Sequence, residues 1–338
     1  MRQVLISPAP LDGVEAPFKQ VLIEAGFKLV YPRVGRQLVE SEIARYLEGC
    51  QAVLAGSEPY TRAVMEKHPQ LRIIARVGVG YDAVDIQAAT ERGIVVTIAP
   101  GTNQDSVAEH TMMLILACAR TLVNQHNQIV AGDWPRNANV PLRGQTLGII
   151  GLGRIGQAVS LRALAFNMHV LAFEPQPNQE FVEKNGITLC SLEEVMRRAD
   201  FLSLHAPLQT ETRYLINTQT LTWMKPTAYL INTSRGGLVC EKDLVEHLRQ
   251  RRIAGAALDV FEEEPPSPEN PLLRLDNVIF TAHTAGVDWR SRDDMALSAA
   301  QAIVDLSRGC WPAEKIVNSA VRERFRWEET GVTARDAR

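Results

Sequence analysis

The sequence predicts an α/β protein with two domains, each built on a parallel β-sheet. Its 338 residues are about twice the length of a common domain. Short apolar runs alternate with helical patterns over the first part of the chain, and the same alternation starts again at Gln145. Strands that are separated by helices pair in parallel, because each helix returns the chain to the edge of the sheet from which it started.

The composition excludes several classes of protein. Hydrophobic residues make up 46% of the chain and charged residues 22%, and the formal net charge is −3. Lys and Arg are scattered, unlike in a nucleic-acid-binding or membrane-binding surface. The apolar runs are far shorter than the roughly 18 residues that a membrane span needs, and no signal peptide is recognised. The five cysteines are dispersed without metal-ligand spacing, so we expect a cytoplasmic protein with reduced thiols and no metal.

The first series contains five strand-like runs with helical patterns between them. Ser41 is placed where a helix would begin, and Gly26 and Gly49 are placed where helices would end. With helices between the runs, we expect a parallel sheet that is covered on both faces. The expected strands are Val4–Ser7, Lys28–Tyr31, Ala52–Gly56, Arg72–Gly78 and Ile94–Thr97.

The pattern changes after this series. From Asp105 to about Ile129 the apolar spacing is helical, and no turn signal interrupts it before Ala131–Pro135. So long a segment suits a connection between domains, or a surface that packs against a partner subunit. A second long helix is expected at Asp293–Gly309, and the charged end of the chain from Val321 is expected to be a solvated, partly mobile tail.

Six strand-like runs follow Gln145, which is the content of a doubly wound nucleotide-binding sheet. They are Thr146–Gly151, His169–Glu174, Asp200–Pro207, Ala228–Ser234, Ile253–Val260 and Asn277–His283.

A glycine-rich loop joins the first of these runs to a helical pattern. In Gly151-Leu152-Gly153-Arg154-Ile155-Gly156, the first glycine permits a tight turn and the second lets backbone approach a pyrophosphate. The third allows helix and strand to pack closely, and the helix N-terminus offers N–H groups to phosphate. The loop therefore predicts a dinucleotide site, formed by Gly151, Gly153, Arg154, Ile155 and Gly156. The alternative is a strand–helix turn without a ligand.

An acidic residue indicates which dinucleotide is bound. Glu174 ends the next run, 18 residues after Gly156, close to the offset of about 20 that is typical of the ribose-binding acid. A carboxylate there accepts hydrogen bonds from both ribose hydroxyls and repels a 2′-phosphate. Because no Arg or Lys lies in the adjoining FEPQPNQ, we expect NAD rather than NADP.

Three further residues follow predicted strands, at the sheet edge where ligands of open α/β sheets bind. Arg235 can hold a planar carboxylate with two parallel N–H bonds. His283 can give a proton to a carbonyl oxygen as hydride arrives and take it back in oxidation. Glu264 can bond the other ring nitrogen and orient the imidazole. Each also has a simpler reading: a sheet-edge ion pair for Arg235, a solvated carboxylate for Glu264 and a capped core residue for His283.

Several long motifs occur in an order that identifies a family. From about Val53 to Asn318 the chain resembles the D-isomer-specific 2-hydroxyacid dehydrogenases, in particular phosphoglycerate dehydrogenases and hydroxypyruvate or glyoxylate reductases of the short form without a regulatory domain. The motifs are RVGVGYDAVDIQAATERGI, NQDSVAEHTMMLILACAR, LRGQTLGIIGLGRIGQ, INTSRGGLV, AGAALDVFEEEPP and TAHTAG. The resemblance makes Arg235, Glu264 and His283 the catalytic set, with Glu264 chosen among three glutamates because it directly precedes proline.

The resemblance also implies contacts that spacing alone does not. Val77, Gly78 and Val79 would bind the substrate carboxylate through backbone N–H groups, beside Arg235. Further cofactor contacts would come from His205, Pro207, Thr212, Thr233, Ser234, Asp259 and Gly286.

The domain arrangement is likewise implied by the family. A substrate domain of residues 1–99, completed by 288–338, would hold an inserted NAD-binding domain of residues 100–287, with two Rossmann-like or flavodoxin-like sheets and the active-site cleft between the domains. The chain would form a homodimer through the inserted domain. One departure is Ala282, because the family usually has Pro before the catalytic His.

The substrate is left open by the sequence. We expect a small D-2-hydroxy acid and its 2-oxo acid, of the 3-phosphoglycerate, glycerate/hydroxypyruvate or glyoxylate type. Arg62, Arg76 and Arg136 are candidates to bind a substrate phosphate, or they are ordinary surface arginines. Alternatives are an NAD-binding, corepressor-like regulatory protein and a phosphite dehydrogenase. Hydrolysis of adenosyl-homocysteine fits less well, since that chemistry typically uses lysine and cysteine in the site.

Overall fold

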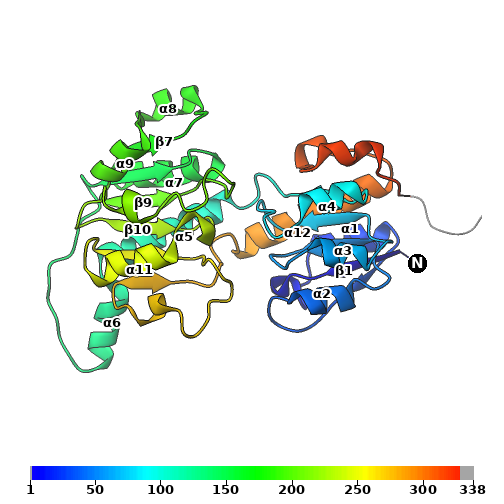
Figure 1. Cartoon of the computed structure of the whole chain (residues 1–338), viewed down its shortest axis with the longest axis horizontal. Coiled ribbons are helices and arrows are strands. Elements are labelled where there is room, and N and C mark those ends of the chain that lie inside the picture. The colour runs from blue at the N-terminus through cyan, green and yellow to red at the C-terminus, as the bar shows by residue number, and fades with distance from the viewer. Residues whose placement is uncertain (1, 328–338) are drawn as a thin grey trace, which may run out of the picture. The chain divides into compact units, whose positions relative to one another are not determined.

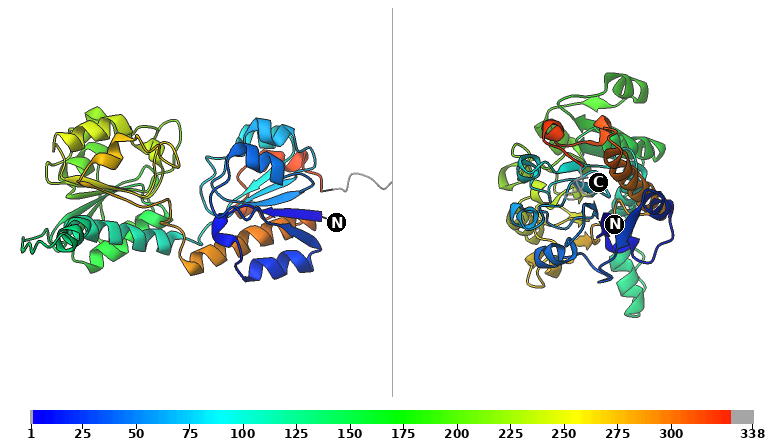
Figure 2. Two further views of the ribbon diagram at one scale, coloured as in Figure 1. Left: turned by 90° about the horizontal axis from the view of Figure 1, so that it is seen from below. Right: turned by 90° about the vertical axis from the view of Figure 1, so that its right-hand side faces the viewer.

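The computed structural model describes residues 2–327 and divides the chain into two compact units. Unit 1 joins Met1–Asn103 to the segment that starts at Trp289, and unit 2 is Gln104–Asp288. Unit 2 is therefore inserted into unit 1 (Figure 1). Both units have a parallel sheet with helices on its two faces, as Figure 2 shows, which confirms the predicted α/β class.

Unit 1 contains a five-stranded parallel sheet in the order β2-β1-β3-β4-β5. This is the flavodoxin-like order, with a topological switch between β1 and β3. The strands are β1 Arg2–Ile6, β2 Phe27–Val30, β3 Ala52–Ala55, β4 Ile73–Arg76 and β5 Val95–Thr97. The helices are α1 Pro17–Glu24, α2 Glu40–Tyr46, α3 Arg62–Glu66, α4 Ile86–Glu91 and α12 Trp289–Ser307.

The alternation of side chains along β1 explains why this sheet is covered twice. Val4 and Ile6 lie in one apolar cluster with residues of α1 and α12, whereas Leu5 lies in another with residues of α2, α3 and α4. All three side chains are buried. A strand that is apolar on both faces needs a helical layer on each side.

Unit 2 contains a seven-stranded parallel sheet in the order β12-β11-β10-β9-β6-β7-β8. The switch point lies at β6, beside β9 and β7. The strands are β6 Thr146–Ile150, β7 His169–Phe173, β8 Thr188–Leu189, β9 Phe201–Leu204, β10 Tyr229–Asn232, β11 Gly255–Leu258 and β12 Val278–Phe280. The helices are α5 Gln104–Ala119, α6 Leu122–Val130, α7 Arg154–Ala165, α8 Gln179–Asn185, α9 Leu192–Arg198, α10 Thr218–Leu221 and α11 Glu241–Arg249. The six predicted strands are all present, and the two-residue edge strand β8 was not predicted.

The helix expected from Asp105 to Ile129 is in fact two helices. It breaks after Ala119, and Thr121 adopts the left-handed conformation with φ of 47°, so α5 and α6 are bent by 58° relative to each other. Within the described residues, no single helix is long and apolar enough to cross a membrane; α5 and α6 meet that criterion only together, across the bend.

The prediction of a solvated tail from Val321 is wrong for the residues that the structure describes. Val321 is fully buried, and Phe325 and Trp327 pack against the same core cluster of unit 1. The Trp327 ring lies edge-on to Phe27 with ring centroids 6.0 Å apart. Three apolar side chains among charged ones therefore anchor this segment, and the tail from residue 328 lies outside the described residues.

Candidate active site

The predicted site residues of unit 2 follow the carboxyl ends of its parallel strands, so they lie at one edge of the sheet. Gly151 follows β6, Glu174 follows β7 and His205 follows β9. Thr233, Ser234 and Arg235 follow β10, Asp259 follows β11, and His283 lies three residues after β12.

The glycine loop combines close contacts with open space. Gly151 has φ of +94°, and a Cβ there would lie 2.6 Å from the backbone nitrogen of Ala206. A Cβ on Gly156 would clash with the backbone oxygen of Gly151, whereas one on Gly153 would meet nothing within 4 Å. α7 starts directly after Gly153, which caps it without a side chain. The loop therefore leaves room for a phosphate at the start of a twelve-residue helix, and it fits NAD.

The three predicted side chains at this loop differ in their surroundings. The Arg154 side chain, at the first position of α7, is exposed, and Ile155 is half-buried against the apolar cluster beneath α7. Glu174 lies next to the loop: its Oε2 accepts a hydrogen bond from the backbone N–H of Leu152 at 2.9 Å, and its Oε1 accepts one from Gln176 at 3.0 Å. Each carboxylate oxygen keeps a further lone pair for a ribose hydroxyl.

The segment after β9, which starts at His205, packs closely against Gly151 of the glycine loop. The His205 Nε2 lies 2.8 Å from Oγ of Ser203, and burial lowers the pKa of His205 to about 3, so its imidazole is neutral. The Thr212 hydroxyl donates to the Pro207 carbonyl at 2.6 Å and accepts from the N–H of Gln209 at 2.8 Å. Thr212 therefore fixes the shape of the segment that starts at Pro207.

The turn after β10 orients Arg235. Asn232, which the sequence did not single out, accepts from the N–H of Ser234 at 3.1 Å and donates to the Arg235 carbonyl at 2.9 Å. The Ser234 hydroxyl donates to the Ala206 carbonyl at 2.7 Å, and the Thr233 hydroxyl lies 2.9 Å from that of Thr111 on α5. Arg235 is half-buried, and its Nη1 donates to the Ser234 carbonyl at 2.7 Å.

His283 and Glu264 form a close pair. Nδ1 of His283 lies 2.6 Å from Oε2 of Glu264, and Oε1 of Glu264 accepts from the N–H of Phe261 at 3.0 Å. The two side chains are 34% and 23% exposed, so the pair lies at the surface of the sheet edge. Across residues 2–327, Nε2 of His283 makes no hydrogen bond and is available to a ligand.

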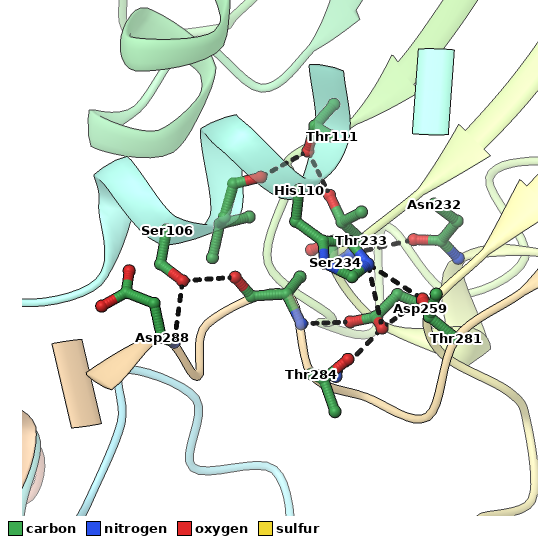
Figure 3. Close-up of polar contacts among 12 residues, drawn as sticks. Ser106, His110, Thr111, Asn232, Thr233, Ser234, Asp259, Thr281, Thr284 and Asp288 are labelled. Carbon is green, nitrogen blue, oxygen red and sulfur yellow. Dashed lines mark hydrogen bonds and ion pairs between the residues drawn. The ribbon is translucent and has the colours of Figure 1, made fainter. Parts of the chain in front are cut away.

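Asp259 holds the loop that carries His283. It is 1% exposed. Its Oδ1 accepts from the N–H of Thr284 at 3.0 Å, and its Oδ2 accepts from the N–H of Ala285 at 2.9 Å (Figure 3). Its own carbonyl accepts from the N–H of His283 at 2.8 Å. Gly286 continues the same loop and is half-buried.

In unit 1, the Val77–Gly80 turn follows β4 and is half-buried. Gly78 has φ of +156°, and its carbonyl accepts from Ala99 at 2.9 Å. In the described part of the chain, the N–H groups of Gly78 and Val79 make no hydrogen bond. The buried Arg76 supports the turn, because its Nε donates to the Gly80 carbonyl at 2.8 Å.

Comparison with known proteins gives a consistent result. Residues 112–285 match the family described as D-isomer specific 2-hydroxyacid dehydrogenase, NAD binding domain. The chain is 44% identical over 269 residues to the D-3-phosphoglycerate dehydrogenase of Methanocaldococcus jannaschii, which covers 79% of this chain but only 51% of that protein. It is 37% identical over 289 residues to the glyoxylate reductase of Korarchaeum cryptofilum, which covers 83% of this chain and 87% of that protein. The chain thus spans about half the length of the first relative.

Solved structures agree over most of the chain. The TT0316 protein from Thermus thermophilus has a TM-score of 0.83 and 36% identity and covers 93% of this chain and 100% of that one. A D-lactate dehydrogenase from Aquifex aeolicus, complexed with NAD and lactic acid, has a TM-score of 0.81 and 28% identity and covers 94% and 99%.

Proposed function

This chain belongs to the D-isomer-specific 2-hydroxyacid dehydrogenase family and is an NAD-dependent oxidoreductase, and we propose that it interconverts a small, unphosphorylated D-2-hydroxy acid and its 2-oxo acid with His283 as the general acid and base. The observation that carries the proposal is the 2.6 Å contact between Nδ1 of His283 and Glu264, which leaves Nε2 as the nitrogen that faces a ligand.

The proton chemistry follows from this pair. NAD supplies the acceptor, and NADH the donor, of the hydride. As the 2-oxo acid is reduced, Nε2–H of His283 gives its proton to the carbonyl oxygen, and in the oxidation Nε2 takes the hydroxyl proton. Glu264 fixes the tautomer and the ring orientation by accepting from Nδ1–H, and its negative charge stabilises the imidazolium.

Substrate binding is assigned to Arg235 and the Val77–Gly80 turn. A guanidinium can bind the substrate carboxylate or the reacting carbonyl through parallel N–H bonds, and Asn232 holds the turn from which Arg235 projects. The N–H groups of Gly78 and Val79, which make no hydrogen bond in the described residues, are suited to a carboxylate oxygen.

The charges around the turn favour a substrate without a phosphate. Arg76 donates to the carbonyls of Gly80 and Ala55, and Arg62 is paired with Glu91 at 2.8 Å. Both candidate cations are therefore already engaged within unit 1. Glu58, which follows β3 at the same sheet edge, is 1% exposed and accepts from the Ser7 hydroxyl. Glyoxylate and hydroxypyruvate fit this setting better than a phosphorylated acid. The alternative is that Arg136, which is exposed in unit 2, binds a substrate phosphate.

The cofactor contacts are proposed from the geometry of the sheet edge. Gly151, Gly153, Arg154, Ile155 and Gly156 would take the pyrophosphate, and Glu174 the ribose. The remaining predicted contacts stay predictions: His205, Pro207, Thr212, Thr233, Ser234, Asp259 and Gly286.

A homodimer through unit 2 is proposed from its exposed apolar side chains. None of the residues of α6 is buried. Val130 is 75% exposed and Trp134, in the loop that follows α6, is 79% exposed. A second copy of the chain would cover this surface, because exposed apolar residues grouped on one segment typically mark an interface. Val130→Lys combined with Trp134→Lys should give a monomer in sedimentation velocity; an unchanged sedimentation coefficient would contradict the proposal.

A substrate panel tests the function. NADH oxidation is measured with glyoxylate, hydroxypyruvate and phosphohydroxypyruvate, and NAD reduction with phosphite. We expect turnover with glyoxylate or hydroxypyruvate, and kcat/KM at least tenfold lower for the phosphorylated acid, about 1.4 kcal/mol of transition-state binding. A preference for phosphohydroxypyruvate would overturn the assignment of substrate, and turnover of phosphite alone would overturn the reaction.

A further inference from the structure

We propose that His110 is a positioning residue for the reaction: through Thr281 it fixes Asp259 and thereby the loop that carries His283. This inference rests on the proposed role of His283. The residues involved come from α5 and from the segments that follow β11 and β12, as Figure 3 shows.

The hydrogen atoms in this chain of contacts can be assigned. The Thr281 hydroxyl oxygen lies 2.5 Å from Oδ1 of Asp259 and 3.0 Å from Nε2 of His110. A carboxylate only accepts, so the single hydroxyl proton of Thr281 goes to Asp259. The Thr281 oxygen must then accept from His110, which carries a proton on Nε2. The order of donation is His110 to Thr281 to Asp259.

This order matters because Asp259 is buried. A carboxylate that is 1% exposed needs hydrogen bonds in place of water. Its partners are the Thr281 hydroxyl and the N–H groups of Thr284 and Ala285. Those three residues lie on either side of His283, so the Asp259 carboxylate holds the loop both before and after His283.

His283 needs that support. Its φ of 52° lies in the left-handed region, which is strained for a residue other than glycine and persists only where the surrounding structure holds it. The N–H of His283 donates to the Asp259 carbonyl. A loop that relaxed from this conformation would turn the imidazole away from its present direction.

α5 holds the same loop at a second point. Ser106 and His110 are four residues apart and therefore share a face of the helix. The Ser106 hydroxyl donates to the Ala285 carbonyl at 2.8 Å and accepts from the N–H of Asp288 at 3.2 Å. α5 is mostly buried, so it offers a rigid support. His110 itself is 15% exposed. Its Nε2 lies 3.0 Å from the Thr281 hydroxyl oxygen and 3.6 Å from Oδ1 of Asp259, so the hydrogen bond to Thr281 is the shorter of the two contacts.

The test compares His110→Leu, which removes the N–H, with His110→Gln, whose amide N–H can replace it. Full-length variants are assayed for NADH oxidation with glyoxylate, and NADH affinity is measured by fluorescence titration. We expect His110→Leu to lower kcat about 10- to 100-fold, with NADH affinity and KM within about threefold of wild type. His110→Gln should return kcat to within about threefold. His169→Leu, at the exposed histidine that is the first residue of β7, is the matched control.

A double-mutant cycle adds a second readout. Thr281→Val should resemble His110→Leu, Thr281→Ser should resemble wild type, and the double variant of His110→Leu and Thr281→Val should be no slower than Thr281→Val alone. Full kcat in His110→Leu, or additive losses in the cycle, would overturn the inference while the proposed function stands. A wild-type enzyme without turnover on any 2-oxo acid would overturn the proposed function and this inference with it. If His110→Leu does not fold, the His110→Gln and Thr281 variants decide.

Discussion

Glu264 bridges the His283 ring and the chain's own backbone. Its Oε2 lies 2.6 Å from Nδ1 of His283, and its Oε1 accepts a hydrogen bond from the N–H of Phe261. Because both oxygens are engaged, the carboxylate can neither rotate nor release the ring without losing a bond. The orientation of the imidazole is therefore set before any substrate binds.

Replacing the ring removes the proposed proton donor. His283→Gln should bind NADH with unchanged affinity, because the glycine loop is untouched, but kcat should fall by about 10²- to 10⁴-fold. Stopped-flow or steady-state oxidation of NADH gives the rate, and fluorescence quenching gives the affinity. A variant that keeps the full rate would show that another group supplies the proton.

Replacing the carboxylate separates its two contributions. Glu264→Gln keeps an oxygen that can accept from Nδ1 but loses the charge, and Glu264→Ala loses both. We expect kcat to fall about 10-fold in the first variant and about 100-fold or more in the second, since the orienting carboxylate of a catalytic histidine can contribute up to about 10⁴-fold. Equal rates in Glu264→Ala and wild type would mean that the contact is only structural.

Two glycines of the same loop should respond in opposite ways to one added methyl group. Gly153→Ala places its Cβ in open space, so the free energy of unfolding should stay within about 0.5 kcal/mol of wild type, while NADH affinity falls at least tenfold. Gly156→Ala drives its Cβ into the Gly151 carbonyl, and it should lower the free energy of unfolding by about 1–3 kcal/mol. Urea denaturation and NADH titration measure the two quantities. If Gly153→Ala binds NADH as wild type does, phosphate does not approach that residue.

His205 should make stability depend on pH. Burial lowers its pKa to about 3, whereas in the unfolded chain it takes up a proton below about pH 6.5. Between these values the unfolded state binds more protons, so this contribution to stability is lost as the pH falls, by at most about 1.4 kcal/mol per pH unit. His205→Gln lacks the effect. Urea denaturation at pH 7, 6 and 5 should therefore show wild type losing more stability than the variant, and parallel losses would show that His205 is accessible to protons in the folded state.

The strands and the edge that carries the site were predictable from the sequence. Buried parallel strands are continuous apolar runs, and their carboxyl ends collect the residues that follow them. The two-residue β8 was not predictable, because Thr188 and Leu189 form no run. The break at Thr121 was not predictable either. Thr121 adopts the left-handed conformation, but no glycine or proline at this point in the sequence indicates that the helix ends.

The residues that support the site through hydrogen bonds could not be recognised from the sequence either. Ser106 bonds Ala285 across 179 positions of sequence, and His110 bonds Thr281 across 171. Both lie in a segment whose periodicity indicates only a buried helix. Residues that touch a ligand can be recognised by their type and place, but residues that hold them in position depend on tertiary contacts that no local pattern encodes.

The insertion of unit 2 has a consequence for how the chain is made. The core of unit 1 contains Ala296, Ala299 and Ile303 of α12 beside Val4 and Phe18, whereas both cores of unit 2 consist entirely of residues between 108 and 280. On the ribosome, the inserted unit can fold first. Until α12 is synthesised, the first hundred or so residues leave one apolar face uncovered. Chaperones that hold exposed apolar chain should bind that waiting segment, and the emergence of α12 should release them.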